Sequence, residues 1–220
     1  MNVRVALAVL VALPAHASLI LSPGTVVANS LGESNPSNNG IDRAISQFAL
    51  STSYTSGVTN YTDYFSPAPG PADQLNTYAA ANLTGAVDFD LGAEFYLVGL
   101  ALWNLGANSA VNNFKVLSSP DNTFTTLTVL TDDNAIPDPT AGANFFAQLF
   151  TFTNPGTTRY VRFEVLSNHN NTLLGFAELA FEADTEPPPV PTPELSSFLL
   201  VAAGGMAFLL WARSRSQIPS

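Results

Sequence analysis

The stretch Val87–Asn104, VDFDLGAEFYLVGLALWN, decides the fold class of this chain. Apolar and acidic residues alternate strictly over Val87–Leu91, and a period of two is typical of a strand with one buried face and one wet face. Gly92–Glu94 then predicts a tight turn. The apolar run Phe95–Trp103 is short and rich in bulky residues, which favours a strand buried on both faces.

Similar patterns on both sides of this stretch predict an all-β domain. The prolines of Asp132–Thr140 predict a loop. Within Gly40–Gly57 apolar residues recur at helical spacing, so a short helix and a loop both stay open. Alternating or Thr-rich segments predict further strands at Leu19–Leu21, Thr25–Ala28, Val111–Leu117, Phe124–Leu130, Asn144–Thr153, Thr158–Leu166 and Gly175–Ala183.

Composition narrows the class of protein. The 220 residues are 46% hydrophobic and 11% charged, which suits one domain plus targeting segments. The net charge of -10 argues against a nucleic-acid partner, because binding phosphates needs a basic surface. The chain has no cysteine, which excludes disulfides, zinc–thiolate sites and a cysteine nucleophile. An exported chain without disulfides favours a bacterial envelope or surface protein.

The N-terminal segment Met1–Ala17 has the pattern of a secretory signal peptide. Arg4 supplies the positive start, and the apolar run Val5–Leu13 is too short to span a bilayer. Ala15–Ala17 matches the A-x-A cleavage pattern, so we expect cleavage after Ala17. An N-terminal anchor helix that stays attached is the alternative.

The C-terminal segment has the pattern of a membrane anchor. Asp184–Glu194 is rich in proline, which predicts an extended linker. Leu195–Ala212 carries no charge and would span about 27 Å as a helix, close to the hydrocarbon thickness. The basic tail Arg213–Ser220 should stay in the cytoplasm by the positive-inside rule. The predicted β domain, residues 18–183, is then expected on the outer side of the membrane.

The sequence VPTPE at Val190–Glu194, followed by an apolar helix and a basic end, resembles the PEP-CTERM sorting tail of Gram-negative bacteria. The resemblance implies processing near Pro193 and Glu194 by an exosortase-type enzyme. The protein would then be released or transferred to the exopolysaccharide layer. A permanent single-pass anchor is the alternative.

Four segments carry a second family resemblance. They are DLG at Asp90–Gly92, LVGLALWN at Leu97–Asn104, TRYVRFEV at Thr158–Val165 and GFAELAF at Gly175–Phe181. In this order they resemble the discoidin family, also called coagulation factor five/eight type C, over Asn39–Ala183. The resemblance implies a galactose-binding-like jelly-roll β-sandwich.

The same resemblance implies a structural calcium ion between the first loop and the last strand. By position, Asp42 and Glu178 would be its carboxylate ligands. Calcium takes six to eight oxygens, so loop carbonyls would have to complete such a site. The alternative is that both are ordinary polar residues, with Asp42 in a turn.

The sequence argues against an active site. Removal of the signal peptide takes away His16 and leaves His169 as the one histidine. No nucleophile elbow, zinc-protease motif, P-loop or dinucleotide fingerprint is present. Asp88 and Asp90 share one face of a predicted strand, and the alternation places that face in water.

Aromatic and amide side chains in predicted loops are the candidates for binding a sugar, because rings stack on sugar C–H faces and amides bond hydroxyls. The loops are Tyr61–Phe65, Asn104–Asn108 and Asn168–Asn171. Trp103 is interpreted as a core residue, and a plain polar hairpin connection is the alternative for the third loop. The candidate ligand-binding residues are Tyr64, Asn104, Asn168, His169 and Asn170.

These features lead to one hypothesis and one rival. The hypothesis is a non-catalytic module, exported to the outer face of a Gram-negative cell or its matrix, that binds an extracellular polysaccharide. The rival is a structural envelope or matrix protein without a specific ligand. A hydrolase is a much weaker third reading.

Overall fold

The computed structural model describes residues 18–65, 77–106, 109–136, 146–169 and 173–185, all within the compact unit Met1–Thr185. Its short helices are α1 (Pro36–Asn39), the 3-10 helix η1 (Ile41–Ala44) and α2 (Tyr61–Phe65). The strands are β1 (Ser18–Leu21), β2 (Thr25–Asn29), β3 (Tyr78–Ala79), β4 (Gly85–Asn104), β5 (Asn113–Ser119), β6 (Thr128–Asn134), β7 (Ala147–Val165) and β8 (Gly175–Asp184).

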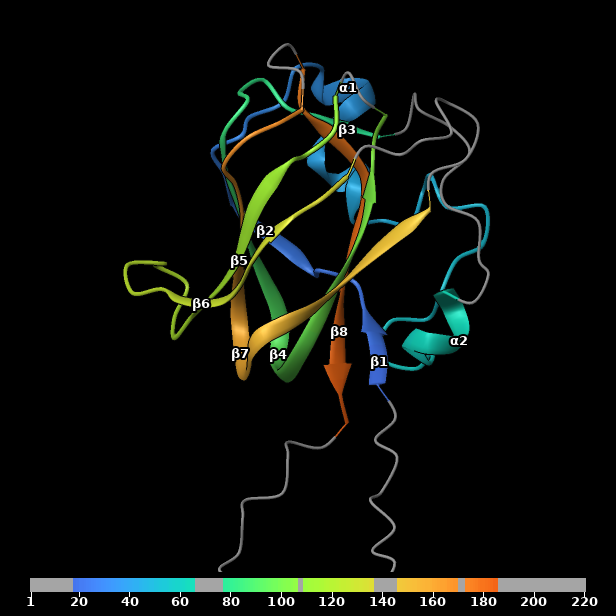
Figure 1. Cartoon of the computed structure of the whole chain (residues 1–220), viewed down its shortest axis with the longest axis vertical. Helices are drawn as coiled ribbons and strands as arrows, with labels where there is room; N and C mark the ends of the chain where they lie inside the picture. The colour runs from blue at the N-terminus through green and yellow to red at the C-terminus, as the bar shows by residue number, and fades with distance from the viewer. Residues whose placement is uncertain (1–17, 66–76, 107–108, 137–145, 170–172, 186–220) are drawn as a thin grey trace, which may run out of the picture. The chain divides into compact units, whose positions relative to one another are not determined.

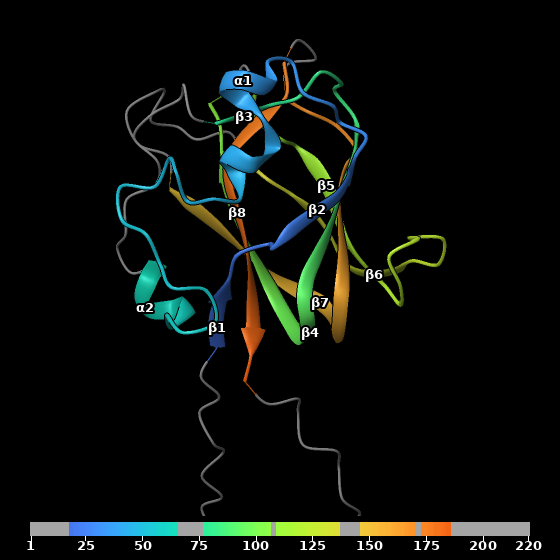
Figure 2. The ribbon, with the colours of Figure 1, turned by 180° about the vertical axis from the view of Figure 1, so that it is seen from behind.

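The strands form an antiparallel sheet in the order β1-β8-β4-β7-β5-β6, with β2 added to β4 and β3 to β8. The sheet folds over on itself because the long strands β4 and β7 pass through both layers (Figures 1 and 2). β2 pairs with the first part of β4, Val87–Asp90, whereas β8 pairs with its last part, Tyr96–Asn104. The predicted all-β class is confirmed, but the two layers are joined through shared strands.

The predicted tight turn at Gly92–Glu94 is wrong, because β4 continues through it as a bulge. Asp90 pairs with Tyr160 and Phe95 with Thr158, so four residues of β4 lie opposite Arg159 alone. Gly92 adopts φ +82°, which a glycine takes at little cost. A bulge bends a strand without reversing it, and β4 can therefore cross from one layer to the other.

Two further strand boundaries differ from the prediction. Asn144–Thr153 and Thr158–Leu166 were expected as separate strands, but β7 runs without a break from Ala147 to Val165. Its pairing with β4 shifts at Leu97–Gly99, and Pro155 lies in that irregular stretch, where a missing N–H costs no ladder bond.

The predicted strand at Phe124–Leu130 is also shifted and takes in the first residues of the loop predicted at Asp132–Thr140, whose last four residues lie outside the described part of the chain. The strand begins at Thr128 and ends at Asn134. Phe124 lies before it with φ +52°, a left-handed conformation that a strand cannot contain. The Gly40–Gly57 segment, left open between helix and loop, holds only the short turn η1.

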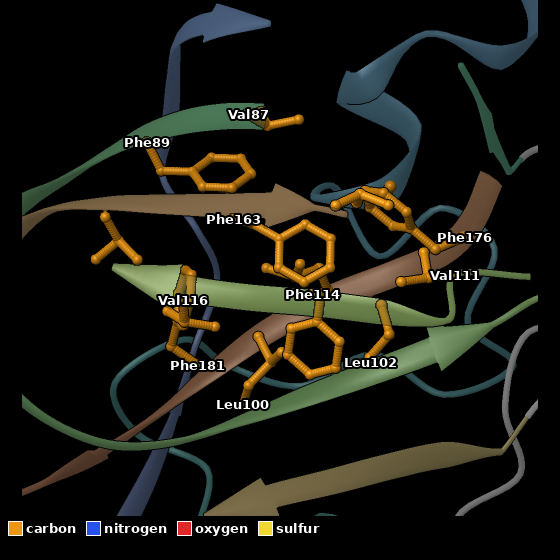
Figure 3. Packing of buried hydrophobic residues seen from close by; sticks show 14 of the residues in the cluster. Val87, Phe89, Leu100, Leu102, Val111, Phe114, Val116, Phe163, Phe176 and Phe181 are labelled. Atoms are coloured by element: carbon orange, nitrogen blue, oxygen red, sulfur yellow. The ribbon is translucent and has the colours of Figure 1, made fainter. Parts of the chain in front are cut away.

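Aromatic side chains from both layers fill the main core. Phe89 of one layer packs against Phe181 of the other with ring centroids 6.2 Å apart. Phe163 lies 5.5 Å from Phe176, and these side chains converge between the layers (Figure 3). The alternation predicted for β7 is confirmed, because Val161, Phe163 and Val165 are all buried.

A second buried cluster lies on the other face of β4 and β8. Ala101 and Trp103 of β4 project there and are covered by the segment that contains α2. The expected burial of Phe95–Trp103 on both faces is confirmed from Leu97 onward, although Val98 is only half-buried. Trp103 is 1% exposed, so its interpretation as a core residue is confirmed.

Several predicted segments lie outside the described residues. These are the signal peptide with Ala17, the rest of the linker after Thr185, the apolar segment Leu195–Ala212 and the sorting motif with Pro193 and Glu194. Among the residues that are described, no helix is long and apolar enough to cross a membrane.

Candidate functional site

A cleft lies where the bend of β4 meets β7 and the ends of β5 and β6. Its volume is about 590 Å³. Hydroxyl side chains dominate its walls, and one acidic, one basic and one phenolic side chain join them. The lining residues are Ala93, Glu94, Ser118, Ser119, Pro120, Thr126, Thr128, Thr157, Thr158, Arg159 and Tyr160. We call this set the hydroxyl cleft.

The β4 bulge shapes one wall of the hydroxyl cleft. Asp90 accepts hydrogen bonds from the Arg159 guanidinium at 2.6 and 2.8 Å and from the Gly92 backbone N–H at 2.8 Å. The Arg159 hydrogen bonds, followed by the Gly92 N–H, hold the pKa of Asp90 below its usual range. The guanidinium also lies 5.2 Å from the centre of the Tyr160 ring. This wall is therefore fixed in place before any ligand arrives.

The other walls offer polar groups that the protein does not use. Glu94, Thr126, Thr128 and Thr157 are exposed, and their side chains make no hydrogen bond within the described part of the chain. Thr158 is different, because its hydroxyl is buried and donates to the Tyr160 carbonyl at 2.9 Å. Free hydroxyls beside a fixed Arg–Asp pair can bond a ligand that carries many hydroxyl groups.

Asn104, a predicted ligand-binding residue, is instead a structural clamp at the opposite end of β4. Its side-chain NH₂ donates to the carbonyls of Val111 and Ile136 at 2.8 and 2.9 Å. Its side-chain oxygen accepts from the N–H of Val111 and of Leu105 at 2.9 and 3.1 Å. The residue is 0% exposed, so its side chain is not open to a ligand in this structure.

Asn168 and His169 lie at the same end of the sandwich as Asn104. Asn168 is buried and donates to the Leu173 carbonyl, so it too holds a loop together. The His169 ring is exposed and its Nε2 lies 2.9 Å from the Ala135 carbonyl. Asn170 lies outside the described residues. Of this predicted rim, only His169 is described with an exposed side chain.

Tyr64 is buried, contrary to its prediction as a sugar platform. Its hydroxyl donates to the Thr52 carbonyl at 2.9 Å, and its ring packs on Tyr54 and Trp103 at 5.2 and 6.3 Å. Tyr64 is buried because the aromatic residues of α2 pack on the outer face of β4. Burial, and then the charge of Glu178, raises the pKa of the Tyr64 hydroxyl.

Glu178, a predicted calcium ligand, is a completely buried carboxylate. One oxygen, Oε2, accepts from the Gln47 N–H at 3.1 Å, and Oε1 has no hydrogen-bond partner in the described structure. Burial raises the pKa of this carboxyl well above its usual value. An orphaned buried oxygen of this kind needs a cation or a proton beside it.

Asp42, the other predicted calcium ligand, fits the ion less well. It is exposed on η1. Among the described residues no group of three or more acidic, histidine or cysteine side chains could hold a metal. Glu178 therefore fits a structural calcium ion only if backbone carbonyls of the neighbouring loop supply most of the oxygens.

The expectation that Asp88 faces water is wrong. It is 5% exposed and makes a two-pronged pair with Arg162, with distances of 2.6 and 2.8 Å. The Arg162 guanidinium lies in turn 5.5 Å from the centre of the Phe124 ring. The loop before β6 therefore closes over a strand face that alternation alone assigns to solvent.

Sequence reasoning missed the hydroxyl cleft. Its signal was the density of Thr in Thr123–Thr128 and at Thr157–Thr158. The first of these segments overlaps the Thr-rich strand predicted at Phe124–Leu130, and no site was inferred from it. What could not be read from the sequence is that the β4 bulge places these two segments beside Glu94 and Arg159.

No protein-family model matches the chain, and no curated protein matches it. Among solved structures it is similar to the family 32 carbohydrate-binding module of EndoD from Streptococcus pneumoniae, with 14% identity and a TM-score of 0.48. That match covers 74% of this chain and 97% of the module.

Two modules from Clostridium perfringens are also similar. CBM32-3 of a family 31 glycoside hydrolase has 21% identity and a TM-score of 0.41, covering 49% of this chain and 74% of the module. The family 32 module of NanJ, solved with galactose, has 12% identity and a TM-score of 0.38, covering 48% of this chain and 75% of the module.

Proposed function

We propose that this chain is a non-catalytic carbohydrate-binding β-sandwich of the galactose-binding-like type, and that its glycan lies in the hydroxyl cleft. The observation that carries the proposal is the cleft itself, in which free Thr hydroxyls and Glu94 face the ordered Arg159–Asp90 pair and Tyr160. Sugar hydroxyls pair well with such mixed donors and acceptors, and the Tyr160 ring offers a surface for sugar C–H groups.

Binding suits the cleft better than hydrolysis does. A glycosidase needs two carboxyl groups on either side of the scissile bond. Glu94 is the one carboxylate among the lining residues, and the nearby Asp90 is already held by Arg159. No lining residue is a histidine. The cleft therefore has the groups to hold a sugar but lacks a paired acid and base.

Electrostatics favour a neutral sugar in this cleft. The charge of Arg159 is balanced by Asp90, so Glu94 gives the cleft a net negative charge. The whole chain carries a net charge of -10. A uronate or a sulfated sugar would be repelled at low salt, whereas a neutral hexose would not.

Export and anchoring belong to the same proposal and rest on the sequence. A cleaved signal peptide, an outward-facing domain and a sorting tail would deliver the module to the extracellular polysaccharide of a Gram-negative cell. Mass spectrometry of the native protein reads both termini. We expect an N-terminus at Ser18 and, with exosortase processing, a C-terminus near Pro193; an intact Met1 would contradict cleavage of a signal peptide.

A structural calcium ion at Glu178 is also proposed, supported by its orphaned Oε1 atom. Calorimetric titration of the full chain with calcium should give a saturable signal that Glu178→Gln removes. No heat and no rise in melting temperature for the unaltered chain would refute the ion.

A glycan array with the full chain tests the central proposal. We expect saturable binding to neutral oligosaccharides and about thirtyfold weaker binding for Thr128→Val/Thr157→Val, since each of the two lost hydrogen bonds is worth about 1 kcal/mol. Thr153→Val is the matched control, because Thr153 is exposed on the same strand but lies outside the cleft. A flat array would instead support the rival, a structural protein without a ligand.

A further inference from the structure

A second hollow lies on the outer face of β8, β4 and β7, away from the hydroxyl cleft. It has a volume of about 260 Å³ and contains a carboxylate between apolar walls. Its lining residues are Tyr61, Thr62, Phe65, Leu149, Phe150, Thr151 and Glu182. We call it the Glu182 trough.

The floor of the Glu182 trough is open because the central strand carries small residues there. Gly99 of β4 pairs with Glu182 of β8 on one side and with Thr151 of β7 on the other. A Cβ atom on Gly99 would lie 2.6 Å from the Glu182 Oε2 atom and 2.9 Å from the Phe150 carbonyl. Glycine is therefore needed to let the carboxylate lie across the strand.

The next set of paired residues along the sheet extends the trough. Ala101 pairs with Ala180 on β8 and with Leu149 on β7. Leu149 is 52% exposed, and Thr151 is exposed beside it. This side of the trough is thus an apolar surface open to solvent.

Helix α2 forms the remaining wall with two aromatic rings. Tyr61 and Phe65 lie edge to face, with centroids 4.6 Å apart. Tyr61 is 4% exposed, yet its hydroxyl has no hydrogen-bond partner in the described structure. A buried hydroxyl normally has a partner, so this one points to a ligand that the protein alone does not provide.

Among the described residues Glu182 has no basic partner. None of the lining residues is Lys or Arg, and no described residue forms an ion pair with it. Burial raises the pKa of its carboxyl, the nearby Asp184 adds to that effect, and the Ser18 hydroxyl opposes it. A half-buried carboxylate beside aromatic rings is the arrangement that attracts an organic cation.

We propose that the Glu182 trough binds a small organic ammonium ion, with the ammonium group on Glu182 and its apolar body along Leu149 and the α2 rings. The Tyr61 hydroxyl accepts one ammonium N–H, and the aromatic faces favour the positive charge. The site is independent of the hydroxyl cleft, with which it shares no lining residue.

Titration of the full chain with benzylammonium and with neutral benzyl alcohol tests this site. We expect saturable binding of the amine, at least tenfold weaker binding of the alcohol, and at least tenfold weaker amine binding by Glu182→Gln. Glu164→Gln is the matched control, since Glu164 lines neither hollow. Equal binding of amine and alcohol, or an unchanged affinity of Glu182→Gln, would overturn the proposal.

One further variant and one further ligand separate the possible outcomes. Leu149→Lys changes an exposed residue and places a positive charge in the trough, so it should abolish amine binding even if Glu182→Gln proves unstable. Glucosamine tests whether an amino sugar or an apolar amine is preferred, and tight binding of either depends on Glu182. The glycan array reports the hydroxyl cleft separately, so the two proposals can fail independently.

Discussion

Two Arg–Asp pairs join β4 to β7 at neighbouring positions, and they differ in how deeply they are buried. Asp88 and Arg162 have side-chain exposures of 7% and 25% and form part of the packed structure. Asp90 and Arg159 are more exposed, at 23% and 42%, and Arg159 lines the hydroxyl cleft. The buried pair should matter for stability and the exposed pair for ligand binding.

Arg162→Ala should therefore lower the free energy of unfolding by about 3 kcal/mol, because it leaves the Asp88 carboxylate buried without a partner. Chemical denaturation measures this directly. Arg159→Ala is the control and should cost clearly less, since solvent can take over the more exposed Asp90. Equal losses for the two variants would show that burial does not separate them.

Glu178 predicts an unusual pH dependence. Its pKa in the folded chain is raised by burial, so the folded state binds the proton more tightly than the unfolded state. The stabilisation is complete below the unfolded pKa of about 4.3 and is lost as pH rises through the folded value. Without calcium, the melting temperature should fall toward neutral pH.

Comparison with Glu178→Gln isolates that effect, because the amide carries no charge at any pH. Between about pH 5 and 8 the difference in melting temperature should grow in favour of the variant when calcium is chelated. A difference that stays constant over this range would show that Glu178 does not change its protonation relative to the unfolded chain.

At the residue scale the sequence predicted the burial of apolar side chains better than that of polar ones. Trp103 was expected in the core and lies there, whereas Asp88 and Asn104 were expected at the surface and are buried. Their partners are distant in sequence: Arg162 is 74 residues from Asp88, and Ile136 is 32 residues from Asn104. A local pattern reports the period of a strand and says nothing of what folds over it.

Among the elements, the β4 bulge does most to shape the molecule. It passes the strand from one layer to the other, offers Glu94 to the cleft and places the Gly92 N–H on Asp90. The sequence signal at Gly92–Glu94 was real, but a glycine with positive φ serves a turn and a bulge equally well. What distinguishes a bulge from a turn is that β4 pairs with β7 both before and after Gly92–Glu94.

Gly92→Ala tests the bulge. The added Cβ meets no atom within 4 Å, so its cost is purely conformational at φ +82°. We expect a loss of about 1 kcal/mol in unfolding free energy, together with weaker glycan binding. Gly156→Ala is the control, since a Cβ there makes only an ordinary contact 3.8 Å from Leu130 and φ is not positive. A neutral Gly92→Ala would contradict the bulge geometry.

For the whole molecule, the two ends of the described domain lie together. Ser18 of β1 pairs with Asp184 of β8, and Asp184 also pairs with Tyr96, close to the β4 bulge (Figure 1). Predicted strands at both ends of the described domain, Leu19–Leu21 and Gly175–Ala183, were confirmed to within a residue. The hydroxyl cleft was not predicted, because it arises where three distant segments meet.

The most direct measurement is a residue-resolved NMR titration of the full chain with a neutral oligosaccharide that the array identifies. Binding in the hydroxyl cleft predicts saturable shifts of backbone amides at Ser118, Thr126–Thr128 and Thr157–Tyr160. The loops around Asn104 and His169 should stay unchanged. Shifts confined to those loops, with a silent cleft, would contradict the proposed site.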